Sequence, residues 1–152
     1  MKQIYWIYYN IQSEENMKIL VIDGQGGRIG SLLIEKIKES KIPCNIIAVG
    51  TNVMATSAML KAGADAGATG ENPVIVNSRD ADYIAGPVGI AMADSLLGEI
   101  TPAMAAAVSG SNAFKLLIPM NRCNHYIAGI KQASLADLIQ DAVNKLQEAP
   151  TE

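Results

Sequence analysis

The sequence predicts an α/β domain of three layers, in which helices cover both faces of a mainly parallel sheet of five to six strands. Three observations predict it. Short apolar runs, typical of strands buried on both faces, alternate with amphipathic segments of helical spacing. A glycine-rich turn joins the first run to the first helical segment. Of the 152 residues, 49% are hydrophobic and 18% charged, which suffices for the core of one domain.

The first four elements are two strand–helix pairs. Residues 18–22 and 46–49 are short apolar runs and predict buried strands. Residues 28–40 carry apolar side chains at helical spacing, with Lys and Glu on the opposite face. Residues 53–61 predict a second helix, which a glycine ends.

The middle of the chain begins with a passage rich in glycine and alanine at 64–72. The apolar residues 74–76 then predict the third strand, and the polar residues 77–80 predict the turn after it. Residues 83–85 are short and uncharged and predict the fourth strand. Residues 90–97 predict a helix.

In the last third, Thr101 followed by proline predicts the start of a helix, whose residues 103–108 are nearly all small. Residues 114–118 predict the fifth strand, and residues 126–130 a weaker sixth. The helix at 135–146 carries one apolar face and begins after a serine. Right-handed crossovers predict the strand order 3-2-1-4-5, with the sixth strand beside the fifth.

The composition of the chain limits the classes of partner that it can bind. A net charge of −3 and a pI near 5.1 argue against a nucleic-acid partner. No apolar run approaches the roughly 18 residues that span a bilayer. Cys44 and Cys123 lie far apart, which fits a reducing compartment. We therefore expect a cytoplasmic protein without membrane or nucleic-acid partners, and a mean hydropathy of +0.17 together with the small residues at 103–108 predicts a homo-oligomer.

Residues 1–16 differ from the rest, since they hold four of the seven aromatic residues. Met17 then leads into the first strand, as a start methionine often does in cytosolic α/β proteins. We interpret 1–16 as a mis-called start, the alternative being an aromatic arm that packs on a partner chain. Residues 17–148 are expected to form one Rossmann-like domain, with 149–152 as a tail.

The glycine-rich turn (residues 24–30) follows the first strand and opens the first helix. Glycines in this context allow a tight turn, close approach of backbone N–H groups to a phosphate, and close packing of the helix on the strand. The partial positive charge of the helix N-terminus favours an anion there. The alternative is a turn that only packs strand on helix. The candidate ligand-binding residues of the turn are Gly24, Gln25, Gly26, Gly27, Arg28, Ile29 and Gly30.

Further polar residues follow the other predicted strands, and ligands bind at the carboxyl ends of strands in an open parallel sheet. The three arginines of the chain, Arg28, Arg79 and Arg122, all fall in these segments, and a guanidinium suits phosphate or carboxylate. We therefore expect a site for a small phosphorylated or anionic ligand. Its candidate residues outside the turn are Thr51, Asn52, Asn77, Arg79, Gly86, Asn121 and Arg122.

Candidates for catalysis are few. His125 is the only histidine, and Cys123 lies two residues before it, so a thiolate–imidazole pair is conceivable. Asp23 is the third candidate, because it ends the first strand beside the turn. No metal site is expected, since the ligand spacings of such sites are missing.

The turn resembles the Gly-Ala-Gly-Gly-Arg-Met-Gly turn of dihydrodipicolinate reductases, which implies NAD(P) or another nucleotide as the cofactor. Two departures qualify this. Such proteins usually carry an acid or an arginine at the end of the second strand, where this chain has Thr51 and Asn52. Asp23 also occupies a position that is normally small and neutral, where its carboxylate would repel a bare phosphate.

From Met17 onward the chain resembles a small bacterial family known only as a domain of unknown function. That resemblance implies a cytoplasmic Rossmann-like domain without an established activity. The leading interpretation is a binding or sensor module for a nucleotide or other phosphorylated metabolite. The alternatives are a small enzyme that uses Cys123 and His125, or a subunit that needs a partner to complete its site. The stretches that carry the resemblance are MKILVIDGQGGRIG, IIAVGTN, AMLKAGADAGATGEN, ADSLLGEITPAMAAAV and IPMNRCNH.

Overall fold

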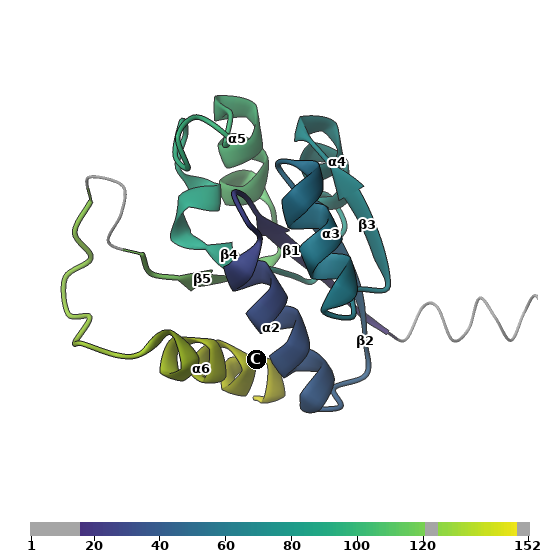
Figure 1. The fold of residues 1–152 in the computed structure, drawn as a ribbon, viewed down its shortest axis with the longest axis vertical. Helices are drawn as coiled ribbons and strands as arrows, with labels where there is room; N and C mark the ends of the chain where they lie inside the picture. Colours follow the sequence, from purple (N-terminus) through teal and green to yellow (C-terminus); the bar gives the residue numbers. More distant parts are fainter. Residues whose placement is uncertain (1–15, 121–124, 149–152) are drawn as a thin grey trace, which may run out of the picture.

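A computed structural model describes residues 16–120 and 125–148 and contains one five-stranded parallel sheet in the order β3-β2-β1-β4-β5 (Figure 1). The α/β fold and the strand order are as predicted. The strands are β1 (Met17–Asp23), β2 (Cys44–Gly50), β3 (Ala66–Thr69), β4 (Tyr83–Pro87) and β5 (Phe114–Ile118). The helices are α2 (Arg28–Glu39), α3 (Val53–Lys61), α4 (Glu71–Asn77), the 3-10 helix η1 (Val88–Ala91), α5 (Pro102–Gly110) and α6 (Leu135–Gln147).

Helices cover both faces of the sheet, so the fold has three layers (Figure 1). Side chains alternate between the faces along the central strand β1. Ile19 and Val21 pack with α2, α3 and α6 on one face, whereas Leu20 and Ile22 pack with α4 and α5 on the other. All four are fully buried, which explains why this strand is one continuous apolar run in the sequence.

The third strand lies eight residues before its predicted position. Residues 74–76 belong to helix α4, in which Val74 is buried and Val76 is 43% exposed, and the strand is Ala66–Thr69 instead. β3 consists of small residues at the edge of the sheet and is mostly exposed, so no apolar run reveals it. Pro73 is tolerated because it lies in the first turn of α4.

Two other predicted elements are wrong. Residues 90–97 do not form a helix, because η1 ends at Ala91 and turns follow it. Residues 126–130 do not form a strand: Tyr126 is 85% and Ile130 43% exposed, and no neighbouring strand pairs with them in the described part of the chain.

The two predicted helix starts are confirmed. The side chain of Thr101 accepts the N–H of Met104 at 3.1 Å and begins α5. The side chain of Ser134 accepts the N–H of Asp137 at 3.1 Å and begins α6. Within the described residues, every helix is too short or too polar to cross a membrane.

Candidate functional site

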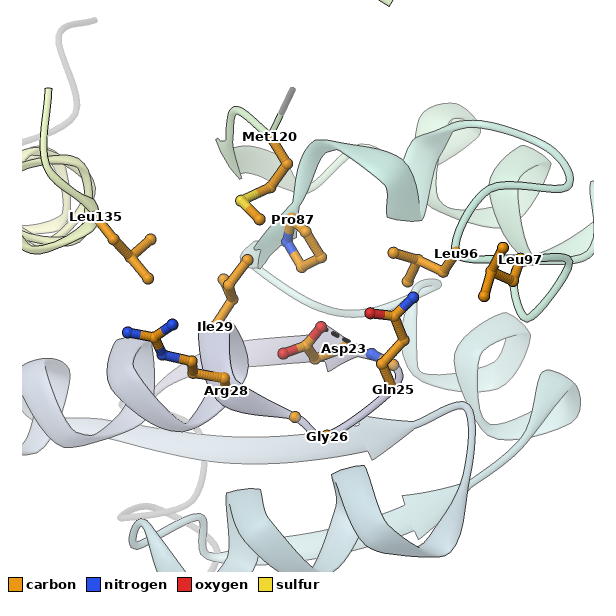
Figure 2. Close-up of a pocket in the computed structure, with 12 residues that line it drawn as sticks. Asp23, Gln25, Gly26, Arg28, Ile29, Pro87, Leu96, Leu97, Met120 and Leu135 are labelled. Atoms are coloured by element: carbon orange, nitrogen blue, oxygen red, sulfur yellow. Dashed lines mark hydrogen bonds between the residues drawn. The ribbon is translucent and has the colours of Figure 1, made fainter. Parts of the chain in front are cut away.

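A pocket of about 320 Å³ lies at the carboxyl edge of the sheet, beside the ends of β1 and β4. The chain runs from β1 outward to β3 and then crosses back to β4 on the other side of β1, so the direction of winding reverses between these two strands. Open parallel sheets bind ligands at this reversal, and the volume is typical of small-molecule sites. This switch-point pocket is lined by Asp23, Gly24, Gln25, Gly26, Gly27, Arg28, Ile29, Pro87, Leu96, Leu97, Met120 and Leu135 (Figure 2).

The pocket has a charged end and an apolar end. Arg28 lies near Leu135 on one side, and Leu96 and Leu97 lie on the other (Figure 2). The guanidinium of Arg28 is exposed, and no carboxylate of the described residues forms an ion pair with it. An unpaired guanidinium beside an apolar wall suits a ligand with one anionic group and an apolar body.

Asp23 closes the inner end of the pocket and caps helix α2. The residue is 5% exposed, and its carboxylate accepts backbone N–H groups from Gly24 at 2.8 Å and from Gly30 at 2.7 Å. Burial raises the pKa of Asp23, and the nearby Glu99 adds to the rise, although the backbone donors lower it in part. The N–H of Gly30 is one of those that a bound phosphate would use at this helix end. The side chain of Asp23 therefore replaces an anion there.

Glu99, which we did not predict, binds the other side of the glycine-rich turn. Its carboxylate accepts the N–H of Gln25 at 3.0 and 3.2 Å, the side-chain amide of Asn52 at 3.0 Å, and the hydroxyl of Thr51. Burial alone would raise the pKa of Glu99, but these hydrogen bonds lower it overall. Thr51 and Asn52 therefore contact a carboxylate of the chain itself at the end of β2. A lone glutamate in a loop gives no sequence signal for this contact.

The glycines of the turn differ in how much room surrounds them, as shown by the atoms that an added Cβ would meet. A Cβ at Gly27, where φ is +73°, would lie 2.8 Å from Cα of Ala55 in α3. A Cβ at Gly30 would lie 2.5 Å from Sδ of Met59 and 3.0 Å from Cβ of Asp23. These two glycines allow helix packing, as predicted for part of the motif. A Cβ at Gly26 would meet nothing within 4 Å, so that position faces open space beside the pocket.

The wall opposite Arg28 comes from the loop between η1 and α5 (residues 92–100). Asp94, Leu96 and Leu97 have φ values of 62°, 55° and 56°, which non-glycine residues rarely adopt. The buried hydroxyl of Ser95 donates to the carbonyl of Gly89 and holds the loop on η1. Leu97 is 97% exposed although it lines the pocket.

The predicted convergence of three arginines is wrong for Arg79. Because 74–76 is helical, Asn77 ends α4 and Arg79 precedes β4, so both lie at the amino edge of the sheet, opposite the pocket. The side chain of Asn77 donates to the carbonyl of Pro73 at 2.9 Å, and Arg79 lies beside the end of α5. Neither residue contributes to the switch-point pocket.

Of the remaining candidate site residues, the structure describes Gly86 and His125. Gly86 lies inside β4, where a Cβ would be 2.2 Å from the carbonyl oxygen of Ile22, so its size serves strand packing. His125 is partly buried. The candidates Asn121, Arg122 and Cys123 lie outside the described residues; Met120, just before them, lines the pocket.

The family model described as "Domain of unknown function (DUF3842)" matches residues 18–151, which confirms the resemblance drawn from the sequence. No curated protein matches. Among solved structures, the chain is similar to a dodecameric FMN-dependent Ubix-like decarboxylase from Escherichia coli O157:H7. The TM-score is 0.43 and the identity 17%, over 88% of this chain and 78% of that chain. All residues of the switch-point pocket lie within the region that the family model matches.

Proposed function

We propose that this chain, which belongs to the DUF3842 family, binds a small phosphorylated metabolite of about mononucleotide size in the switch-point pocket. The observation that carries the proposal is the pairing of Arg28 with an apolar wall at the point where the sheet reverses its winding. A guanidinium binds phosphate through two parallel hydrogen bonds.

In this proposal each end of the pocket recognises a different part of the ligand. Arg28 binds the phosphate from the exposed rim, where the group keeps part of its hydration. Leu96 and Leu97, on the opposite side, contact an apolar or aromatic group such as a nucleobase. Asp23 already accepts two backbone N–H groups, so its remaining capacity is for hydroxyl donors of the ligand.

Thermal unfolding and calorimetric titration of the full chain with AMP, FMN and ribose 5-phosphate test this proposal. We expect at least one of these phosphates to bind and to raise the melting temperature, since a ligand at 100 times its Kd adds about 2.7 kcal/mol. Its unphosphorylated counterpart should bind more weakly. A wild-type protein that binds none of the three would contradict the proposal.

A matched pair of arginine variants locates the binding. Arg28→Ala should weaken the phosphate by about ten- to hundredfold, because a charge-assisted contact is lost. Arg79→Ala removes the same charge at the opposite edge and should bind as the wild type does. Equal affinities of the Arg28→Ala variant and the wild type would exclude this pocket as the site.

A further inference from the structure

The glycine-rich turn has two sides, and they are filled differently. The switch-point pocket lies on the side of β4, where Pro87 and Arg28 line it. On the side of β2, the carboxylate of Glu99 contacts the turn at the N–H of Gln25 and contacts Thr51 just after β2. A Cβ at Gly24, between the two sides, would lie 2.9 Å from Oε2 of Glu99.

A dinucleotide needs both sides of such a turn. In dinucleotide-binding folds the pyrophosphate lies against the backbone N–H groups of the glycine-rich turn and of the helix N-terminus that follows it. Here Asp23 accepts the N–H of Gly30, and Glu99 accepts the N–H of Gln25. Carboxylates of the chain itself therefore accept two of the backbone N–H groups that a pyrophosphate would use.

We infer that Glu99 is a specificity-determining residue: its carboxylate is an internal anion that closes the β2 side of the turn, so that the protein accepts mononucleotide-sized phosphates and rejects dinucleotides. The part that concerns mononucleotide-sized phosphates rests on the function proposed above. The part that concerns the internal anion stands on the contacts of Glu99 alone.

The donors around Glu99 are held by other elements, so we expect them to remain in place without it. The Oδ1 of Asn52 accepts the N–H of Ala55 at 2.9 Å and caps α3, which leaves its amide group directed to the turn. That amide donates to Glu99 at 3.0 Å and to the carbonyl of Gln25 at 2.9 Å. The hydrogen bonds that lower the pKa of Glu99 keep it ionised at neutral pH, as an internal anion must be.

The loop that carries Glu99 is anchored independently of it. The N–H of Asp94 donates to the carbonyl of Ile100 at 2.7 Å, and Ser95 donates to Gly89. Ile100 itself is fully buried against α5. Removal of the Glu99 side chain should therefore leave an anion site with three donors rather than a collapsed loop.

Chemical rescue of the full chain tests the inference. In Glu99→Ala, acetate or inorganic phosphate should raise the melting temperature more than chloride at equal ionic strength does, and this excess should be missing in the wild type. Asp94→Asn is the control, because Asp94 is an exposed carboxylate of the same loop without a side-chain hydrogen bond to the turn, and asparagine tolerates its φ of 62°. The double variant Arg28→Ala/Glu99→Ala should keep the rescue, since the rescuing anion binds away from Arg28.

Affinity for dinucleotides gives the second readout. NAD⁺ should bind Glu99→Ala at least about tenfold more tightly than it binds the wild type or Asp94→Asn, because an acceptor no longer competes for the donors. Glu99→Gln keeps the size of the side chain and removes its charge, so it should show a smaller gain in affinity for NAD⁺. It replaces Glu99→Ala in these measurements if the alanine variant fails to fold.

The outcomes separate this inference from the proposed function. If neither Glu99 variant is rescued by anions or gains affinity for NAD⁺, the inference is overturned whatever the wild type binds. If the wild type binds NAD⁺ as tightly as AMP, the claim of specificity is overturned. If the wild type binds no mononucleotide but acetate rescues Glu99→Ala, the internal anion stands and the proposed function fails.

Discussion

The carboxylate of Asp23 accepts the backbone N–H of Gly30, seven residues later, at 2.7 Å. Asp23 ends β1 and Gly30 lies in the first turn of α2, so one buried side chain joins the central strand to the helix that follows it. At most helix N-termini the side chain of the N-cap residue accepts such an N–H group. The N-cap residue here is Gly27, which has no side chain.

The capping role of Asp23 predicts a loss of stability. Asp23→Ala should lower the free energy of unfolding by about 2–3 kcal/mol, because the helix loses its cap and buried N–H groups lose their acceptor. Urea unfolding followed by circular dichroism measures this change. Asp141→Ala removes an exposed carboxylate of α6 and should change the free energy by less than about 0.5 kcal/mol. Equal stabilities of the two variants would mean that Asp23 does not hold the helix.

Two neighbouring glycines should differ in how much stability the same substitution costs. Gly27→Ala should lower the free energy of unfolding by about 2–3 kcal/mol, since its φ is +73° and the new Cβ would press on the backbone of Ala55. Gly26→Ala should leave the stability within about 0.5 kcal/mol, because open space surrounds the position.

Binding should be sensitive to Gly26 although stability is not. In the properly folded Gly26→Ala variant, the added methyl group borders the switch-point pocket and should weaken a bound mononucleotide. Calorimetric titration measures the change in Kd. An unchanged Kd would show that the ligand does not approach the turn at Gly26.

Substitution of Leu97 should raise the stability of the protein and weaken ligand binding at the same time. Leu97→Asn should raise the free energy of unfolding by up to about 1 kcal/mol, because asparagine tolerates a φ of 56° better and a side chain that is 97% exposed loses no packing. The same change should weaken the ligand, since it removes an apolar wall. Ala93→Asn, an exposed position of the same loop without a positive φ, should give neither effect. A destabilised Leu97→Asn variant would contradict the assignment of strain.

The stability that Glu99 contributes should depend on pH. Its folded pKa is lowered below the ordinary value of 4.5, so its contribution is fully present above pH 4.5 and is lost as the pH falls through the folded pKa. The difference in unfolding free energy between the wild type and Glu99→Gln should therefore be largest at neutral pH and shrink below 4.5. Urea titrations at several pH values measure it. A difference that grows on acidification would have the wrong sign.

The parts of the fold that the sequence predicts are those in which local chemistry and tertiary packing agree. The run at 18–22 is apolar because β1 is covered on both faces, and Thr101 marks a helix start because its hydroxyl caps the helix. Residues 66–69 offer no such signal, since an exposed edge strand of small residues needs no apolar side chains.

One misplaced strand also explains the main error in the predicted site. With 74–76 taken as a strand, Arg79 falls at the carboxyl edge; with 74–76 in a helix, it falls at the amino edge. Glu99 was missed for a different reason. Its contact with Gln25 spans 74 residues of sequence and depends on a loop whose backbone follows no local preference.

The residues that line the switch-point pocket lie far apart in the sequence, so they leave the ribosome at different times. Asp23, at the inner end of the pocket, is made before Leu135, which follows much later in the sequence at the start of α6. A growing chain on the ribosome therefore lacks one wall of the pocket until α6 has emerged and docked on α2. A metabolite that needs that wall binds only after α6 has docked, so it stabilises the folded domain and cannot guide the earlier steps of its folding.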